Sequence, residues 1–235
     1  MKHDGIIERV EELRKYTIGD KRKNPLKEAR DFVRGEFPDW KDGCHVLPFV
    51  VGEGNGDAAE WKVLGQIYEY AMSERQPMFV LAYVRNCNVD GEMDIVIAHR
   101  HAGVKILQLR NTALTEGEIK NEIRQKINQV IRGKRKISKL YQKEFGESFD
   151  RISGYGCIPF VVLPNSLQKL KERGILSAED CESPDSFKKW WEEFIFSWNR
   201  IPRPKRLSDK TYLNLLSMCD AFSHSFPIFW LVLIA

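Results

Sequence analysis

The sequence VDGEMDIVIAHRHAGVKILQLRN occupies residues 89–111 and contains two short apolar runs, residues 93–98 and 104–109. A polar connection, residues 99–103, separates them. Apolar runs of this length on either side of a short polar turn are typical of a β-hairpin. We therefore expect a hairpin of two buried strands here.

Polar residues interrupt the apolar pattern of this hairpin at defined places. Glu92 and Asp94 belong to the first strand, and Gln108 and Arg110 belong to the second. Side chains two residues apart on a strand point to the same face of the sheet. A carboxylate, a carboxamide and a guanidinium on paired strands predict a small polar site on an otherwise apolar sheet.

This pattern resembles a known family. An acidic residue on one strand, a short turn, and an apolar strand ending in acid-x-Lys characterise the PD-(D/E)XK nuclease superfamily. GEMD followed by GVKILQLRN is most similar to its NERD (nuclease-related) domain, and the resemblance covers residues 51–164, about half of the chain. It implies an α/β fold with a restriction-endonuclease-like core, in which a central mixed sheet is flanked by helices, with extra helices at both ends.

The resemblance also implies roles for individual residues. Asp94 matches the metal-binding aspartate, and Gln108 matches the Glu or Gln of the second motif. Leu109 is the middle residue of that motif, and Arg110 matches its lysine. Glu60 matches the glutamate of the preceding helix. The implied catalytic residues are Asp94, Gln108, Arg110 and Glu60, and the implied ligands of Mg²⁺ (or Mn²⁺) are Asp94, Gln108 and Glu60.

Two of these positions depart from the family pattern. A carboxamide oxygen at Gln108 can ligate Mg²⁺ but brings no charge. Arg110 stays protonated and is broader than a lysine, so it suits phosphate binding better than water activation.

Glu60 has a second interpretation. It lies in the first turn of a helix expected over residues 58–73, with Asp57 as its N-cap. An acid in a first turn is favoured by the helix dipole alone. The Gly-rich residues 52–57 lack a G-K-[ST] motif, so we exclude a nucleotide-binding loop.

The distribution of charge indicates a polyanionic partner. The chain has 235 residues, 43% hydrophobic and 30% charged, with a net charge of +4. These values describe a globular protein that is neither disordered nor strongly basic. Residues 100–151 hold 13 Lys or Arg against 6 Asp or Glu, a balance of +7, so the remainder has −3. Positive charge is thus concentrated beside the hairpin, as nucleic-acid binding requires.

Much of this charge falls on a long helix expected over residues 115–145, with Thr115 and Glu118 as a capping box and Gly133 as a possible break. Its cations form either an ordinary solvated face or a phosphate-contacting surface. The residues we select for nucleic-acid contact are Lys120, Arg124, Lys134, Arg135 and Lys136.

The remaining elements complete the expected order. We expect strands at residues 44–51, 78–84 and 157–163, and Pro48 puts the first at a sheet edge or at a bulge. We expect helices at residues 6–13, 25–34, 183–198 and 211–222. Residues 1–50 are interpreted as a helical extension with an edge strand, 51–200 as the nuclease-like domain, and 201–235 as a basic linker, a helix and an apolar tail. The uncharged residues 226–235 are interpreted as the start of a truncated further domain, a tucked strand or an exposed patch.

Five scattered cysteines without a C-x-x-C pair indicate reduced thiols and an intracellular location, cytoplasmic or nuclear. The N-terminus lacks the apolar segment of a signal peptide. We expect no membrane partner and no small-molecule cofactor.

Two functions follow. In the first, the chain is a metal-dependent nuclease, a possible Mg-dependent endonuclease. In the second, the nuclease fold persists without catalysis and binds nucleic acid or a protein partner within a larger assembly.

Overall fold

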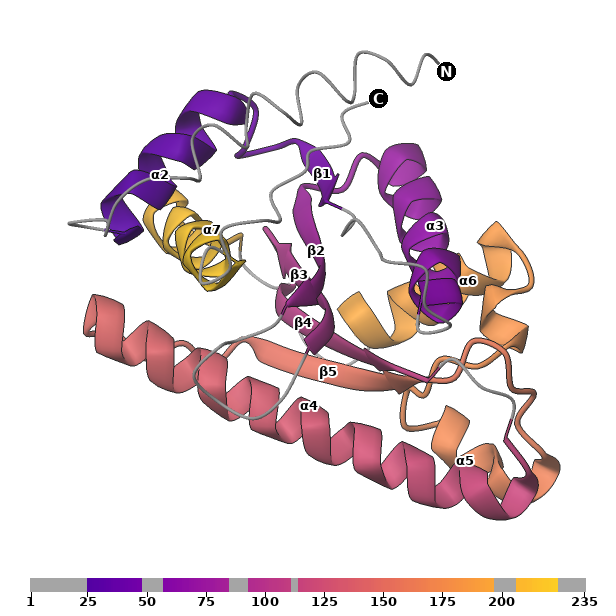
Figure 1. The fold of residues 1–235 in the computed structure, drawn as a ribbon. Coiled ribbons are helices and arrows are strands. Elements are labelled where there is room, and N and C mark those ends of the chain that lie inside the picture. Colours follow the sequence, from indigo (N-terminus) through magenta and orange to yellow (C-terminus); the bar gives the residue numbers. More distant parts are fainter. Residues whose placement is uncertain (1–24, 48–56, 85–92, 111–113, 197–205, 224–235) are drawn as a thin grey trace.

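A five-stranded mixed sheet forms the centre of the molecule. The computed structural model describes residues 25–47, 57–84, 93–110, 114–196 and 206–223, which Figure 1 shows in colour. The strands lie in chain order: β1 (Cys44–Leu47), β2 (Met78–Val84), β3 (Met93–His99), β4 (Gly103–Leu109) and β5 (Ile152–Cys157). The outer pairs, β1 with β2 and β4 with β5, are parallel, whereas β2 with β3 and β3 with β4 are antiparallel. The expected hairpin and the strand at residues 78–84 are confirmed.

Helices flank this sheet, so the expected α/β class is confirmed. They are α2 (Pro25–Glu36), α3 (Asp57–Glu74), α4 (Glu116–Phe145), α5 (Gln168–Lys171), α6 (Pro184–Trp190) and α7 (Asp209–Ser223). Short helical turns η1 (Asn165–Leu167) and η2 (Glu179–Cys181) and a π-helix, η3 (Trp191–Phe196), complete the described elements. In the part of the chain that is described, no helix combines the length and apolarity needed to cross a bilayer.

Strand alternation divides the core into two layers. Val96, Ala98, Val104 and Ile106 pack with α2, α4 and α7 on one face. On the other face, a second cluster joins the sheet to α3, α6 and η3; its strand members include Ile95, Ile97, Leu107 and Leu109. Figure 1 shows α4 running beneath the sheet and α3 with α6 on its other side. The position of a polar side chain along β3 or β4 therefore decides which helix it meets.

Helix α4 begins and ends as its sequence predicts but is continuous. The Glu118 carboxylate accepts hydrogen bonds from the backbone N–H and the hydroxyl of Thr115, at 2.9 and 2.6 Å. Gly146, at φ 68°, ends the helix in the left-handed conformation. Gly133 does not break it, because this glycine faces the sheet: a Cβ there would lie 3.2 Å from Ile106 Cδ1 and from Met93 Sδ.

The expected strand at residues 157–163 is wrong. The strand is β5, ISGYGC, and residues 158–163 form a loop. Pro159 and Pro164 lack the N–H that a strand ladder uses. Ile158, Val161 and Leu163 are nevertheless buried, in a cluster with Ile119 and Ile123 of α4. Burial, and not strand pairing, accounts for the apolar run.

The glycines of β5 have a packing role that the sequence analysis missed. A Cβ on Gly154 would lie 2.5 Å from the carbonyl oxygen of Ile106 and 2.6 Å from Val130 Cγ1. The absence of a side chain allows α4 to approach the sheet at this point.

Several expected elements extend beyond the described residues or lie outside them. The helix at residues 183–198 is confirmed as α6 followed by η3, up to residue 196, and its aromatic residues Phe187, Trp190 and Trp191 are buried as core. Strand β1 is described for four residues and lies at the sheet edge. The helix at residues 6–13 and the apolar residues 226–235 lie outside the described residues. The division at residues 50 and 200 stays a prediction, although α2 and α7 share one core cluster with the sheet.

The close approach at β5 leads to a stability prediction. Gly154→Ala should lower the free energy of unfolding by about 1–3 kcal/mol, because the added methyl group forces α4 away from β4 and β5. Gly117→Ala is the matched control: a Cβ there meets nothing within 4 Å. It should leave stability unchanged or raise it by up to about 1 kcal/mol. Urea denaturation of both variants measures the difference, and equal midpoints would contradict the close-packing account.

Candidate active site

The candidate site begins where β3 and β4 part. Their ladder runs from the pair His99 and Gly103 to the pair Ile95 and Leu107. One residue further on, the Asp94 carboxylate accepts the backbone N–H of Leu109 at 2.6 Å. The side chain of Asp94 thus takes the place of a backbone acceptor at the end of the ladder, which holds the carboxylate at a defined position.

Gln108 lies beside Asp94 on the same face of the sheet. Continuing the antiparallel register by one residue puts these two residues opposite each other. Gln108 is 1% exposed, and its neighbour on β5 is Gly156. A Cβ on Gly156 would lie 3.5 Å from Cβ of Lys126, so α4 passes directly over this point. The structure therefore brings together the carboxylate and the carboxamide that the sequence analysis selected.

Lys126 of α4 is the residue that the sequence analysis did not select. Its Nζ lies 3.9 Å from Asp94 Oδ2, and both side chains are only 13% exposed. The signal was present in the sequence: Lys126 follows Ile123 by three residues and precedes Val130 by four, so it occupies a position in the buried stripe of the helix. The low exposure of Lys126 and its distance to Asp94 show that its ammonium group is directed at the sheet and not at bulk water.

Arg110 makes a different contact from the one its place in the motif implies. It is exposed, and its Nε lies 3.7 Å from Oε1 of Glu122, whose side chain is 14% exposed. The hydrogen bonds from Thr115 hold the pKa of Glu118 below its usual value, and Arg110 contributes a smaller lowering. The guanidinium thus faces the acidic first turns of α4. Glu122 is the second site residue that sequence reasoning missed.

Glu60 approaches from the opposite side of the sheet. It lies on α3, whose buried residues belong to the other core layer, and it is 6% exposed. Lys62 Nζ donates to the carbonyl oxygen of Pro159 at 2.8 Å, which places the start of α3 beside the segment after β5. Glu60 therefore lies at the same end of the sheet as Asp94. Its burial differs from that of an ordinary solvated first-turn acid.

The charges of the site alternate in sign. Asp94 pairs with Lys126, and Glu122 pairs with Arg110. Glu122 and Lys126 are one turn apart on α4, so the helix contributes one charge of each sign. Cys157 lies nearby: burial raises the pKa of its thiol, Cys181 and Asp94 add to the rise, and Lys126 opposes it. The thiol therefore remains protonated and is not a nucleophile at neutral pH.

The chemistry of the donor set fits a hydrated hard cation. Among the described residues, no three His, Cys, Asp or Glu side chains gather as a metal cage. Mg²⁺ does not need one, because it keeps several waters and uses one or two carboxylates. Asp94 with the carboxamide of Gln108 satisfies this requirement. A closed structural zinc site would need four ligands.

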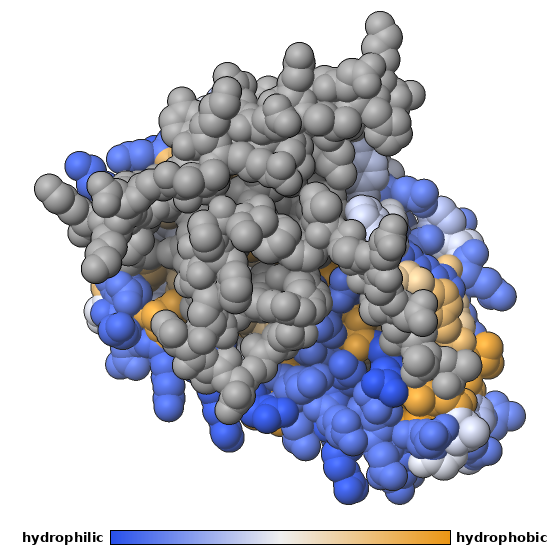
Figure 2. Space-filling model, in the orientation of Figure 1, coloured by the Kyte–Doolittle hydropathy of each residue, from blue (hydrophilic) through white to orange (hydrophobic). Residues whose placement is uncertain are grey.

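The cations selected for nucleic-acid contact lie along α4, two of them in the turns of the site residues Glu122 and Lys126 and three further along the helix. Lys120, Arg124, Lys134 and Arg135 are exposed, and Lys136 is half-buried. Lys134 lies eight residues after Lys126, which is about 12 Å along the helix. Figure 2 shows the lower surface of the molecule, where α4 runs in Figure 1, as predominantly hydrophilic.

No protein-family model matches the chain, and comparison with curated proteins and with solved structures finds no significant match.

The contact between Lys126 and Asp94 predicts competition with a bound metal. Lys126→Gln should tighten Mn²⁺ binding about fivefold or more, because removing a positive charge about 4 Å from the ligand relieves roughly 1 kcal/mol of repulsion or more. Arg132→Gln, an exposed cation on the same helix, should leave the affinity unchanged. Calorimetric titration with Mn²⁺ measures both. Weaker binding in Lys126→Gln would mean that Asp94 is not the ligand.

Proposed function

We propose that this chain is a nuclease-related domain that hydrolyses phosphodiester bonds in nucleic acid with Mg²⁺ or Mn²⁺. One observation carries the proposal: the Asp94 carboxylate is held where β3 and β4 part, beside Gln108 and 3.9 Å from the ammonium group of Lys126. An acid for the metal and a buried cation for the phosphate are the two groups that this reaction needs.

The order of elements supports the proposal. Helix α3, strands β2, β3 and β4, helix α4 and strand β5 follow one another, and β5 pairs parallel to β4 after the helical crossover. This arrangement is compatible with the restriction-endonuclease-like core that the resemblance to the NERD domain implies. In that arrangement, Asp94 and Gln108 occupy the motif positions that resemble the metal site of the PD-(D/E)XK superfamily.

Each side chain then has a defined task. Bound Mg²⁺ would polarise the scissile phosphate and lower the pKa of a bound water. Asp94 and Gln108 would hold the ion. Lys126 would place its ammonium group beside the negative charge that develops on the phosphate. In the resembling family this is the task of the motif lysine, whose position is occupied here by Arg110. Arg110 would bind a neighbouring phosphate, since its guanidinium is exposed and matches phosphate oxygens in geometry.

The second function, a nuclease fold that binds without cleaving, is favoured by one specific observation. Arg110 is paired with Glu122, so the residue at the lysine position of the motif is charge-compensated by the protein itself. A domain retained for binding alone would tolerate this pairing, because the basic surface of α4 does not depend on it.

A cleavage assay separates the two functions. The purified chain should nick supercoiled plasmid, or cut single-stranded DNA or RNA, in Mg²⁺ or Mn²⁺ and not in EDTA. Asp94→Asn should reduce the rate at least 100-fold, because the carboxamide can still accept the Leu109 N–H but has lost the charge that holds the metal.

Two further variants complete this assay. Lys126→Gln should also lose cleavage, in contrast to its tighter metal binding, whereas Arg110→Lys should retain it. Cleavage that persists in Asp94→Asn and Lys126→Gln would rule out this site. Cleavage that appears only in Arg110→Lys would establish the binding-only function.

The surface of α4 is tested independently of catalysis. Each phosphate contact contributes about 0.9 to the slope of log affinity against log salt for double-stranded DNA. The double variant Lys134→Gln/Arg135→Gln should therefore flatten this slope by about 2. Lys169→Gln, an exposed cation on α5, is the control and should leave the slope unchanged. If the double variant binds with an unchanged slope, α4 is an ordinary solvated helix.

A further inference from the structure

A basic cavity lies at the other end of the sheet, between α2 and α7. Its volume is about 470 Å³. Its charged lining residues are four cations and one anion, a balance of +3: Arg30, Arg34, Lys41, Lys210 and Asp209. It is distinct from the Asp94 site, because Asp94 is near the start of β3 and the turn beside α7 follows its end. The five residues of β3 that follow Asp94 span about 17 Å.

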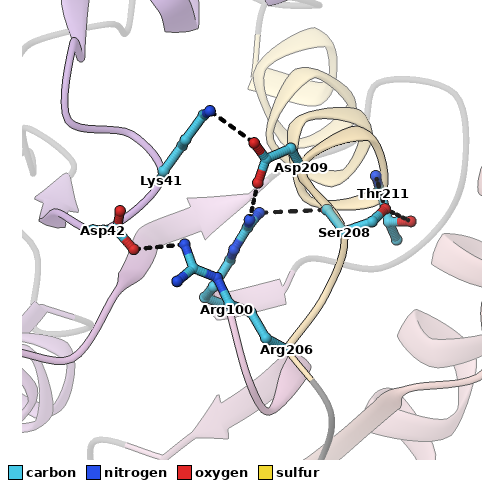
Figure 3. Close-up of polar contacts among 7 residues, drawn as sticks. All are labelled: Lys41, Asp42, Arg100, Arg206, Ser208, Asp209 and Thr211. Atoms are coloured by element: carbon cyan, nitrogen blue, oxygen red, sulfur yellow. Dashed lines mark hydrogen bonds and ion pairs between the residues drawn. The ribbon is translucent and has the colours of Figure 1, made fainter.

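The one carboxylate of this cavity is already neutralised. Asp209 pairs with Arg100, a side chain that is 1% exposed, and its Oδ2 lies 2.7 Å from Lys41 Nζ. Figure 3 shows both cations directed at this carboxylate from different segments. Arg100 also donates to the carbonyl oxygen of Ser208 at 3.3 Å and lies 4.8 Å over the ring of Tyr212. The start of α7 is therefore fixed rigidly beside the cavity.

The two arginines of α2 provide charge that this carboxylate does not offset. They are one helical turn apart, so they share a face. Arg30 Nη2 donates to the neutral Oδ1 of Asn214 at 2.7 Å, and its buried Nε has no hydrogen-bond partner within the described residues. Arg34 is exposed and forms no ion pair in the described part of the chain. Lys210 differs from Arg34 in having an ion-pair partner, because its Nζ lies 2.6 Å from Oε1 of Glu147.

We propose that the cavity between α2 and α7 is a second binding site, for a phosphate group that carries two negative charges. Guanidinium groups match the oxygens of phosphate in geometry, and two of them on one helix face, in a lining of net charge +3, favour a dianion over the single charge of a phosphodiester. Trp40, which is 7% exposed, and Leu213 supply an apolar wall. The volume leaves room for part of the molecule that carries the phosphate.

The same chemistry has two sources: the phosphorylated end of a nucleic acid or a small free phosphate compound. The probes are inorganic phosphate, a mononucleotide, and a short oligonucleotide with either a 5′-phosphate or a 5′-hydroxyl group. Binding is measured by calorimetry on the whole chain, at constant ionic strength. Arg34→Gln is the test variant, since it removes one guanidinium without breaking a contact in the described residues, and Lys169→Gln is the control.

We expect saturable binding that Arg34→Gln weakens about tenfold or more and Lys169→Gln does not change. A preference for the 5′-phosphorylated oligonucleotide that Arg34→Gln removes would identify a nucleic-acid end as the source, and equal binding of phosphate and mononucleotide would identify a free compound. Binding that is not saturable, or that Arg34→Gln leaves unchanged, would overturn the proposal. Asp94→Asn should not alter this binding, so its result is independent of the nuclease proposal.

Discussion

The close passage of α4 over β5 is the contact on which the candidate site depends. A Cβ on Gly154 would lie 2.6 Å from Val130 Cγ1, so the absence of a side chain there allows the helix to pack closely. At Gly156 a Cβ would be in ordinary contact, 3.5 Å from Cβ of Lys126. Because Gly156 neighbours Gln108 on β4, the same approach that closes the core also places an ammonium group next to the motif residues. A larger residue at position 154 would force the helix away from the strands.

In this geometry the strands and the helix contribute different groups to the site. The hairpin provides the neutral and negative groups, Gln108 and Asp94, and the helix provides Lys126. Arg110, at the motif position where the resembling family has a lysine, pairs instead with Glu122 of the same helix. The positive charge beside Asp94 thus comes from helix α4, so the proposed site has a buried cation although position 110 is not a lysine. The cavity between α2 and α7 concentrates charge at the opposite end of the sheet.

The sequence was sufficient for the parts of the fold that depend on local patterns. The hairpin, the strand Met78–Val84 and the capped start of α4 follow from apolar runs and from the pair Thr115 and Glu118. The sequence did not predict β5, because ISGYGC has little apolar character. Its glycines are explained by packing that only the structure shows, where α4 approaches the strand. Asp94 and Gln108 could be selected from strand periodicity and from the resemblance. For Lys126 the sequence shows only a place in the buried stripe of the helix, because its contact with Asp94 depends on which face of the sheet the helix covers.

The most direct test of the account is the position of a bound metal. Crystals soaked in Mn²⁺ should show an anomalous difference peak about 2.0–2.2 Å from a carboxylate oxygen of Asp94, with the Gln108 carboxamide and waters completing the coordination. The peak should be absent in Asp94→Asn. A peak elsewhere in the molecule, or none at Asp94 at a concentration that saturates binding in solution, would contradict the assignment of this site.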